Sequence, residues 1–325
     1  MNCGTTACRK NDLEGSSFAR YGASSEFSII ASGNLYAFAL AACDHTSPDG
    51  LSGEADVNPQ GPIVNIIEGK GEFLGGGATG LVERLDSGDV VKSPWTGRPT
   101  ALDCRQDMAI EAQIYETLGV HPRLVQYKHW DPVGHVLTLE YMPNGNLKEY
   151  VRKHGQGISL SQRQQWVREV TEGVELLHSH NVIQGDVGPH NFLLDIDLSL
   201  KICDFGGSSL DGSQATVAPG VRYRLPGLGG TTVKEDLFAL GSTIYFIATG
   251  HEPYEELTDE DQVEKLYEGG VFPELSEVPF AEIIALCWRQ EVESAGTLIE
   301  LVMRSSEKCQ STQGTCDPMS VYSIL

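Results

Sequence analysis

The spacing of hydrophobic positions divides this chain into a strand-rich first part and a helical second part. Between residues 63 and 141, short apolar runs alternate with turn residues, a pattern typical of β-strands. The strands expected there are residues 63–68, 81–85, 89–92 and 133–141. Residues 103–118 instead have apolar positions three or four apart, which predicts a helix with Asp103 as its cap and Gly119 as its end.

After Pro143-Asn144-Gly145 the apolar spacing becomes mainly helical, so we place a boundary between two lobes at this break. The helices expected after it are residues 146–153, 161–180, 234–249, 259–268, 280–288 and 295–303. Ser161 is expected to cap the second of them. Residues 234–249 are almost all apolar, so this helix should be buried inside a large lobe.

The two ends of the chain have weaker patterns. Residues 1–63 are rich in small and polar residues, and we expect them to form a flexible arm. Within this arm, polar residues interrupt the apolar run 27–43, which favours a loosely structured extension or a helix packed on the body over a signal sequence. Residues 304–325 are expected to be a polar tail.

Charge and cysteine content narrow the functional classes. The chain of 325 residues carries 23 basic and 45 acidic side chains, a formal charge of -22, which argues against nucleic acids and anionic membranes as main partners. No apolar run reaches the length of a membrane helix. The eight cysteines include no C-x-x-C pair, so the sequence suggests neither a zinc site nor a redox dithiol. We therefore expect a reducing compartment, the cytoplasm or the nucleus.

The stretch from Gln184 to Gly206 carries the strongest chemical signal. Asn191 follows Asp186 by five positions, and Asp204 follows Asn191 by thirteen. The apolar runs between the last two predict a hairpin, which would hold a loop carboxylate and amide beside a second carboxylate. Such oxygen ligands suit Mg²⁺ shared with substrate phosphates. A single Asp or Asn could equally serve a turn, so the signal is the joint spacing.

A glycine-rich run lies upstream of a pair of predicted strands and a lysine. Gly75, Gly77, Gly80 and Val82 fit the pattern G-x-G-x-x-G-x-V. Glycines allow backbone N–H groups to approach phosphates closely. A flexible turn or a dinucleotide-binding loop would use the same glycines, but the dinucleotide loop requires a helix after it. Here a predicted strand, a turn and a second strand that ends in Lys92 follow instead.

Together, these motifs resemble the eukaryotic protein kinase family. The glycine loop, strand, turn, strand and lysine occur in the family order, followed by a D-x-x-x-x-N loop and the D-F-G that ends at Gly206. The resemblance implies an α+β, two-lobed protein kinase-like fold over residues 64–303. A small β-rich N-lobe with one long helix would span 64–142, and a larger helical C-lobe would span 143–303. It also implies the use of ATP and Mg²⁺ and an unidentified protein substrate.

The resemblance assigns a role to each candidate residue. Lys92 would bind the α- and β-phosphates and pair with Glu111, for which Glu116 is the competitor. Asp186 would accept or orient the proton of the attacking hydroxyl. The other expected ATP contacts, beyond the glycine loop and Val82, are Val90, Leu139, Glu140, Met142 and Leu193. Asn191 and Asp204 would hold the metal, and Phe205 and Asp236 would be structural anchors, although Asp236 could instead cap its helix.

Several family positions are changed in this chain. Gln184-Gly185 stands where the family has His-Arg, Gly188 replaces a lysine, and Gly220 replaces a substrate-positioning threonine. Leu225-Pro226-Gly227 replaces Ala-Pro-Glu, and no arginine lies at 293–295, where the usual partner of that glutamate is expected after Trp288. These changes imply slow transfer without control by activation-loop phosphorylation.

Three functions fit this pattern. The first is an active protein kinase, with Pro189 and Asn191 favouring Ser/Thr over Tyr as acceptor. The second is a pseudokinase scaffold, which would explain the lost lysine and threonine. The third is a small-molecule phosphotransferase of kinase-like fold, because Gly185-Asp186 followed by Asn191 resembles the H-G-D-x-x-x-x-N loop of those enzymes.

Overall fold

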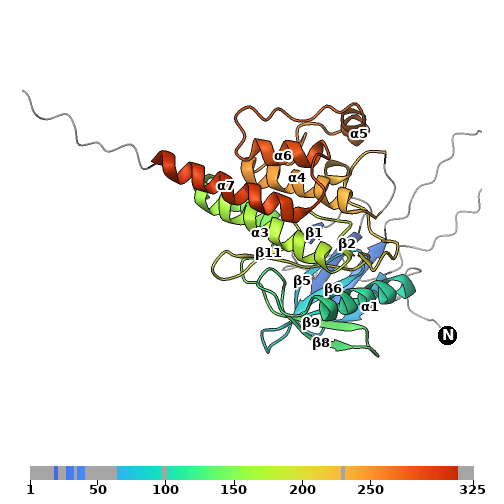
Figure 1. The fold of residues 1–325 in the computed structure, drawn as a ribbon. Helices are drawn as coiled ribbons and strands as arrows, with labels where there is room; N and C mark the ends of the chain where they lie inside the picture. The colour runs from blue at the N-terminus through green and yellow to red at the C-terminus, as the bar shows by residue number, and fades with distance from the viewer. Residues whose placement is uncertain are drawn as a thin grey trace, which may run out of the picture.

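The described part of the chain forms a strand-rich lobe and a helical lobe (Figure 1). The computed structural model describes residues 18–20, 27–32, 35–40, 64–96, 101–227 and 231–313. One five-stranded antiparallel sheet and one long helix build the first lobe. The architecture is therefore α+β and two-lobed, as the sequence predicted.

The sheet of the first lobe has the strand order β5-β6-β7-β9-β8. Its strands are β5 (Glu72–Gly76), β6 (Gly80–Arg84), β7 (Val90–Pro94), β8 (Tyr127–Asp131) and β9 (Val136–Leu139). Helix α1 (Ala101–Leu118) packs on β7, β8 and β9 and buries Met108 and Tyr115 completely. The expected cap at Asp103 is wrong, because the helix begins at Ala101 and Asp103 lies in its first turn, where an acidic side chain is favourable. Gly119 follows the helix with φ +66°, as a terminating glycine should.

The second lobe is built around the buried helix α4. Its helices are α2 (Leu147–His154), α3 (Leu160–Ser179), α4 (Val233–Thr249), α5 (Glu260–Glu268), α6 (Ala281–Trp288) and α7 (Ala295–Gln313). Phe238, Leu240 and Ile244 of α4 are fully buried, and each such side chain contributes about 1.5–3 kcal/mol to stability. Thr232 and Glu235 form a capping box that fixes the start of α4.

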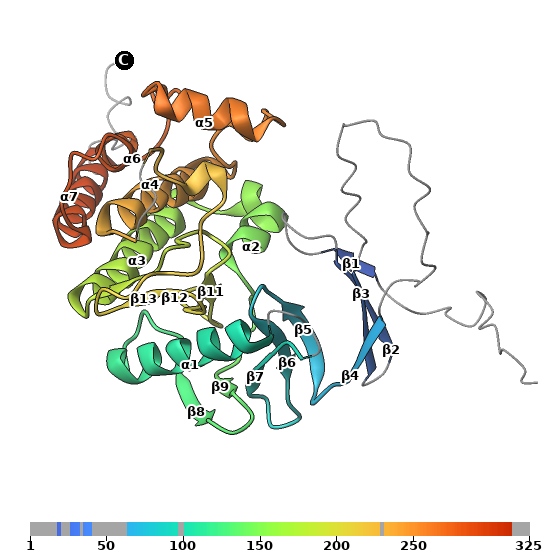
Figure 2. The ribbon, with the colours of Figure 1, turned by 90° about the vertical axis from the view of Figure 1, so that its right-hand side faces the viewer.

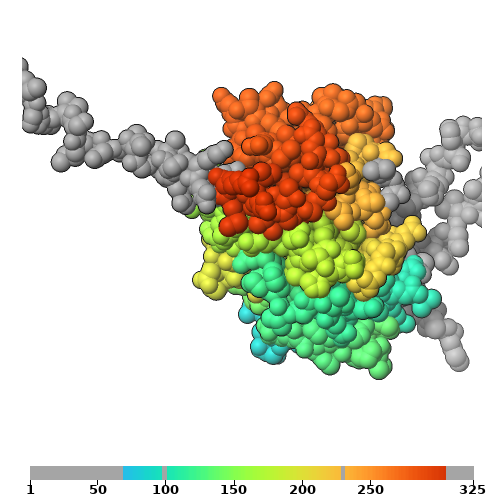
Figure 3. Space-filling view, viewed as in Figure 1, coloured from blue at the N-terminus to red at the C-terminus, as the bar shows by residue number. Residues whose placement is uncertain are grey.

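Two helix boundaries in this lobe differ from the sequence expectation. Ser159 caps α3 by accepting the amide of Gln162, so the expected cap at Ser161 is wrong. Helix α7 runs on to Gln313, past the expected end at Met303 and into the segment expected to be a tail. Its atoms lie directly against those of α3 on the face seen in Figure 3.

Two short hairpins carry the loops of the candidate site. β11 (Phe192–Leu194) pairs with β12 (Leu200–Ile202) in antiparallel register, so that Phe192 lies opposite Ile202. β10 (Val182–Ile183) pairs with β13 (Ser209–Leu210). The β11–β12 hairpin agrees with the sequence prediction. Asn191 lies just before its first strand and Asp204 just after its second, so the hairpin brings the two loops side by side.

Strands also occur in the segment expected to be a flexible arm. β1 (Phe18–Arg20), β2 (Phe27–Ser32) and β3 (Leu35–Leu40) lie in this segment and form an antiparallel sheet, in that order, with β4 (Val64–Glu68) (Figure 2). β4 agrees with the strand expected at residues 63–68. The expectation for residues 27–43, a loose extension or a packed helix, therefore differs from the structure. Gly33-Asn34 between two apolar runs is a hairpin signal that explains the pairing of β2 with β3. The rest of residues 1–63 and residues 314–325 lie outside the described part. Among the helices that are described, none is long and apolar enough to cross a membrane.

Candidate active site

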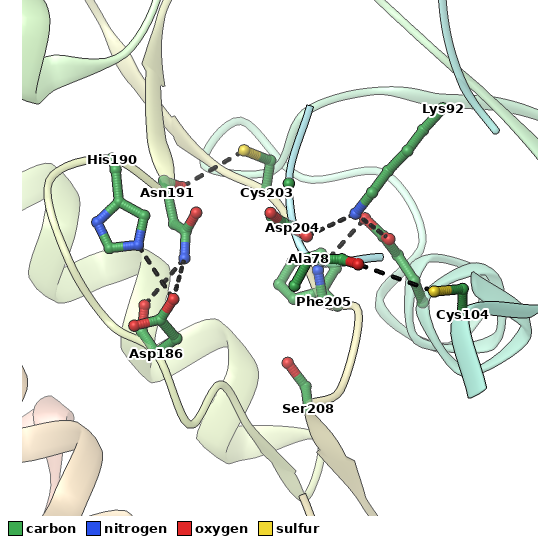
Figure 4. Close-up of polar contacts among 12 residues, drawn as sticks. Ala78, Lys92, Cys104, Asp186, His190, Asn191, Cys203, Asp204, Phe205 and Ser208 are labelled. Atoms are coloured by element: carbon green, nitrogen blue, oxygen red, sulfur yellow. Dashed lines mark hydrogen bonds and ion pairs between the residues drawn. The ribbon is translucent and has the colours of Figure 1, made fainter. Parts of the chain in front are cut away.

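Three charged side chains meet at one point between the sheet, α1 and the end of β12. Strand β7 presents Lys92, whose Nζ lies 2.6 Å from Glu111 Oε2 on α1 and 2.5 Å from Asp204 Oδ1 (Figure 4). Lys92 and Glu111 are almost fully buried, whereas the Asp204 side chain is 45% exposed. The structure thus brings together three residues that the sequence separates by 19 and 112 positions.

The electrostatics of this cluster keep the lysine charged. Burial acts to lower the pKa of Lys92, but the carboxylates of Asp204 and Glu111 outweigh it and hold that pKa above its usual value. For Asp204, desolvation acts to raise the pKa, but the attraction and hydrogen bond of Lys92, together with His190 and the Gly206 amide, outweigh it and hold that pKa below its usual value. Complete burial raises the pKa of Glu111 although Lys92 acts in the opposite direction. Of the two carboxyl groups that contact Lys92, Asp204 is therefore the one that faces solvent.

Neighbouring contacts fix which glutamate pairs with Lys92. Glu111 also accepts the backbone amide of Phe205 through Oε1, at 3.3 Å. Phe205 is fully buried, and its ring packs edge-on against Tyr115 of α1 at 4.9 Å between centroids. Glu116, the competitor, instead accepts the hydroxyl of Tyr127 at 3.0 Å on the exposed side of α1. The helix, the lysine and the D-F-G loop are thus connected through Glu111.

Asp186 and Asn191 lie together in the loop before β11 (Figure 4). Asn191 Nδ2 donates to the backbone oxygen of Asp186 at 2.9 Å and approaches Asp186 Oδ2 at 3.5 Å. His190, which the sequence analysis did not single out, contributes Nε2 at 3.0 Å from the same Asp186 Oδ2. The loop therefore presents a carboxylate whose Oδ2 is held by two neighbouring side chains.

The oxygen atoms in this region fit a magnesium ion. Both hydrogen bonds of the Asn191 side chain use its nitrogen, so within the described residues its amide oxygen is free to act as a ligand. Asp204 supplies an ionised, half-exposed carboxylate. No group of three or more His, Cys, Asp and Glu side chains suited to a metal occurs in the described part. A site of one carboxylate and one amide matches Mg²⁺, which completes its shell with phosphates and water, better than a dedicated protein cage.

Asp236 connects α4 to the loop that carries Asp186. It is 1% exposed and accepts the backbone amides of Gln184 and Gly185, each at 2.9 Å. His178 Nε2 lies 3.0 Å from the Oδ2 that receives the Gln184 amide. A helix cap would bond to the first turn of its own helix, whereas Thr232 performs that function for α4. These contacts are the basis for proposing Asp236 as the anchor of the loop.

Gln184 makes contacts that the sequence analysis missed. Its side chain is fully buried, and Nε2 donates to the backbone oxygens of Asp204 at 2.7 Å and Cys203 at 3.3 Å. Its own carbonyl accepts the Ser208 hydroxyl at 2.8 Å. Gln184 therefore ties the Asp186 loop to the D-F-G loop. The signal in the sequence was its position directly before Gly185-Asp186, which resembles the family histidine.

The glycine loop is folded down onto the D-F-G loop. At Gly80 any side chain would collide with the backbone oxygen of Ser93, since a Cβ would lie 2.2 Å from it. Trp95 Nε1 donates to Gly77 O at 2.9 Å and closes the β5–β6 turn from the side. The Thr79 side chain is buried, with its Cγ2 only 3.0 Å from where a Cβ of Gly206 would be. The contacts of Trp95 and Thr79 were not predicted, because contacts at the tip of a loop do not recur at a regular spacing along the sequence.

The residues expected around adenine line neighbouring strand ends. Val90 pairs directly with Leu139 across β7 and β9, and both are buried, as is Met142. Val82 and Leu193 are half-buried. The Glu140 side chain binds Lys201 at 2.6 Å and the amide of Gln126 at 2.7 Å, and its own amide donates to Gln126 O at 3.0 Å. Within the described contacts, only its backbone carbonyl is left for a base. Gly75 and Gly77 have open space where a Cβ would stand.

Residues 204–227, which we call the activation segment, are fastened mainly by packing. Gly185 has φ +74°, and a Cβ there would lie 3.2 Å from Val217 Cγ1. The amide of Thr216 donates to Gly207 O at 2.8 Å, and its hydroxyl donates to Asp107 on α1 at 2.9 Å. Thus Gly185, which stands where the family has an arginine, is covered by Val217 of the activation segment.

The end of the activation segment is held without the usual ion pair. Arg222 donates to the backbone oxygens of Tyr254 at 3.3 Å and Leu257 at 2.5 Å. The Tyr223 hydroxyl donates to Glu252 at 3.2 Å. Hydrogen bonds from Arg222 and Tyr223 therefore fasten the segment to the loop after α4, next to Leu225-Pro226-Gly227.

Comparisons with known proteins agree with this geometry. The protein kinase domain model matches residues 70–312. Curated relatives include the cytoplasmic tyrosine-protein kinase BMX of Mus musculus, 31% identical over 59% of this chain and 31% of its own length. The putative serine/threonine-protein kinase/receptor R831 of Acanthamoeba polyphaga mimivirus is 25% identical over 74% of this chain and 16% of its own. Mitogen-activated protein kinase kinase kinase 3 of Mus musculus is 29% identical over 62% of this chain and 36% of its own. The matched stretches thus span between 16% and 36% of these relatives' own lengths. Because the protein kinase domain model matches more than half of the chain, the chain belongs to the protein kinase family.

Proposed function

We propose that this protein transfers the γ-phosphoryl group of ATP to a Ser or Thr hydroxyl of a protein substrate, at a slow rate. The observation that carries the proposal is the intact charged cluster: Lys92 bridges Glu111 and Asp204 while Asp186 and Asn191 stand together in the neighbouring loop. Burying three charged groups, fully or in part, costs desolvation energy. A scaffold without nucleotide chemistry has no need to retain these charged groups.

The proposed step is an in-line displacement at the γ-phosphorus. The acceptor oxygen forms a bond to phosphorus while the bond to the β,γ-bridging oxygen breaks, and ADP leaves with that electron pair. Asp186 receives the proton of the acceptor hydroxyl. Lys92 would bind the α- and β-phosphates, with Glu111 holding its ammonium in place. Bound Mg²⁺, held by Asn191 and Asp204, would neutralise phosphate charge.

Two features support a slow rate. Gly188 provides no ammonium group for the γ-phosphate, and one missing electrostatic contact of this kind typically costs about 10²–10³ in rate. Gly220 provides no hydroxyl to position the substrate. Positioning supplies most of the catalysis in phosphoryl transfer, so both losses act on the rate more than on nucleotide binding.

The second candidate is a pseudokinase that binds nucleotide and acts by contact. The observation in its favour is the glycine loop, whose Thr79 rests on Gly206 beside the charged cluster. In this form the loop covers the region where phosphates would bind, so nucleotide must displace Thr79 before it can occupy the site.

Phosphotransfer from radiolabelled ATP with Mg²⁺ separates these candidates. Wild type, Lys92→Met and Asp186→Asn are incubated with generic protein acceptors, and the labelled amino acids are identified after hydrolysis. We expect phosphoserine and phosphothreonine from the wild type only. Equal labelling by all three proteins contradicts the enzyme, and phosphotyrosine contradicts the acceptor class. Thermal stabilisation by MgATP without labelling supports the pseudokinase, and labelling of an aminoglycoside or choline but not of protein supports a small-molecule phosphotransferase.

A further inference from the structure

His190 lies where a side chain at position 188 would otherwise stand. A Cβ built on Gly188 would lie 2.6 Å from His190 Cε1 and 2.8 Å from its Nδ1, far closer than atoms can approach. The Nδ1–Cε1 edge of the imidazole therefore lies against Gly188, and the other ring nitrogen, Nε2, reaches Asp186 Oδ2 at 3.0 Å (Figure 4). Within this loop, the absence of a side chain at 188 is what permits the contact between His190 and Asp186.

We propose that His190 is a positioning residue that holds the Asp186 carboxylate in its reactive orientation. This inference rests on the proposed function, since it assigns a task within that reaction. An ionised carboxylate can only accept, so the imidazole donates through Nε2–H. Because Oδ2 is engaged by His190 and Asn191, the other oxygen is left for the acceptor hydroxyl: no hydrogen bond to Oδ1 occurs within the described residues.

The backbone around His190 is held firmly enough for this role. The amide of Asn191 donates to Gly188 O at 3.0 Å, which closes a tight turn over the residues between them. Pro189 restricts the backbone in the middle of this turn, and its carbonyl accepts the amide of Lys148 at 3.1 Å. The His190 side chain is 42% exposed and Asp186 24%, so both groups are accessible to a substrate. Fixing a general base to a fraction of an ångström is worth up to about 100-fold in rate.

The first part of the test measures kcat and the KM for ATP. His190→Ala should lower kcat about 10- to 100-fold with little change in KM, and His190→Gln, which can still donate to Oδ2, should recover much of the loss. Gly188→Ala should reproduce the loss, because its Cβ drives the imidazole off Asp186. His251→Ala is the matched control: it removes another His–carboxylate pair four residues apart, with Glu255 at 2.6 Å, outside the site. It should leave kcat unchanged.

The outcomes separate failure of the inference from failure of the proposed function. An active wild type with an equally active His190→Ala, or with an unaffected Gly188→Ala, overturns the role of His190 and leaves the kinase standing. An inactive wild type overturns the proposed function. The contact is then judged by NMR of the imidazole N–H proton at about pH 8, where an ordinary histidine is neutral. We expect a hydrogen-bonded Nε2–H proton that exchanges slowly with solvent in wild type and exchanges rapidly in Asp186→Ala. The same Nε2–H exchange in both proteins overturns the inference.

Discussion

On the nucleotide side of the site, one buried ammonium holds two carboxylates, whereas around Gly185, where the family arginine would stand, the contacts are made by glycines, an apolar side chain and backbone groups. Lys92, Glu111 and Asp204 make the first set of contacts. Gly185, Gly207 and Val217 make the second: a Cβ would crowd Val217 at 3.2 Å from Gly185 and would collide with the Thr216 hydroxyl at 2.7 Å from Gly207. The charged residues that would bind nucleotide are kept, and those that would respond to phosphorylation are replaced by packing.

This difference explains how the activation segment can be ordered although Gly185 stands where the family has an arginine that binds phosphate. In a regulated kinase of the pattern that this chain resembles, an ionic contact would form only after phosphorylation. Here Val217 covers Gly185 directly, and Thr216 bonds to Gly207 and Asp107. The contacts require no modification, so the segment is expected to adopt its ordered form in the unmodified protein.

Removing the ammonium from the charged side should have the largest effect on stability. Lys92→Met leaves Glu111 fully buried without its partner, and breaking a buried pair in this way costs about 3–5 kcal/mol. Urea unfolding measures the change. Lys92→Met with Glu111→Gln should recover part of the loss, because the stranded carboxylate is then gone. Lys128→Met, which removes an exposed ion pair with Asp89 in the same sheet, is the control and should cost at most about 1 kcal/mol.

A side chain at Gly185 should test the packed side. Gly185→Ala places a Cβ at φ +74° and 3.2 Å from Val217, and we expect a loss of about 2 kcal/mol from the backbone conformation and the crowding together. Gly212→Ala provides the control, since Gly212 has φ +79° on the same segment but open space around it. Gly212→Ala should therefore lose only the stability that the backbone conformation costs, without crowding. Equal losses in the two variants would show that Val217 does not press on Gly185.

The smallest expected effect concerns the hydrogen bond between the segment and α1. Thr216→Ala removes the donor to Asp107, a partly exposed bond worth about 0.5 kcal/mol. Hydrogen exchange should show faster exchange of the amides of residues 216 and 217, which bind Gly207, with global stability almost unchanged. Thr117→Ala, whose hydroxyl bonds within α1 itself, should leave those amides as in the wild type. If exchange in the segment is the same in both variants, this bond does not hold it to α1.

Local pattern was sufficient to predict much of the fold. The β11–β12 hairpin and the lysine-bearing strand β7 follow from apolar runs and turn residues, and these place Asp204 and Lys92. The pairing of Lys92 with Glu111 rather than Glu116 is set by the face of α1 that meets the sheet, which helical spacing indicates but only packing decides. The helix starts were misplaced by about one turn or less because several residues could serve as cap.

The contacts that the sequence did not predict depend on a missing side chain or on residues far apart in the chain. The position of His190 follows from the lack of a side chain at Gly188, and no motif records the effect of an absence. The bond from Trp95 to Gly77 joins a strand end to a loop tip. The strands β1 to β3 were hidden by the polar composition of the arm. Each of these needs three-dimensional proximity that periodicity does not encode.

The central claim is that the retained charges perform phosphotransfer rather than bind nucleotide alone. Single-turnover transfer from radiolabelled ATP, measured together with calorimetric MgATP binding in wild type and Asp186→Asn, tests it most directly. We predict similar binding in both proteins and a loss of transfer of about 10²-fold or more in the variant, since Asp186 acts on the acceptor proton and not on the nucleotide. Binding in both with no transfer by the wild type, or the same transfer rate in both, would contradict the claim.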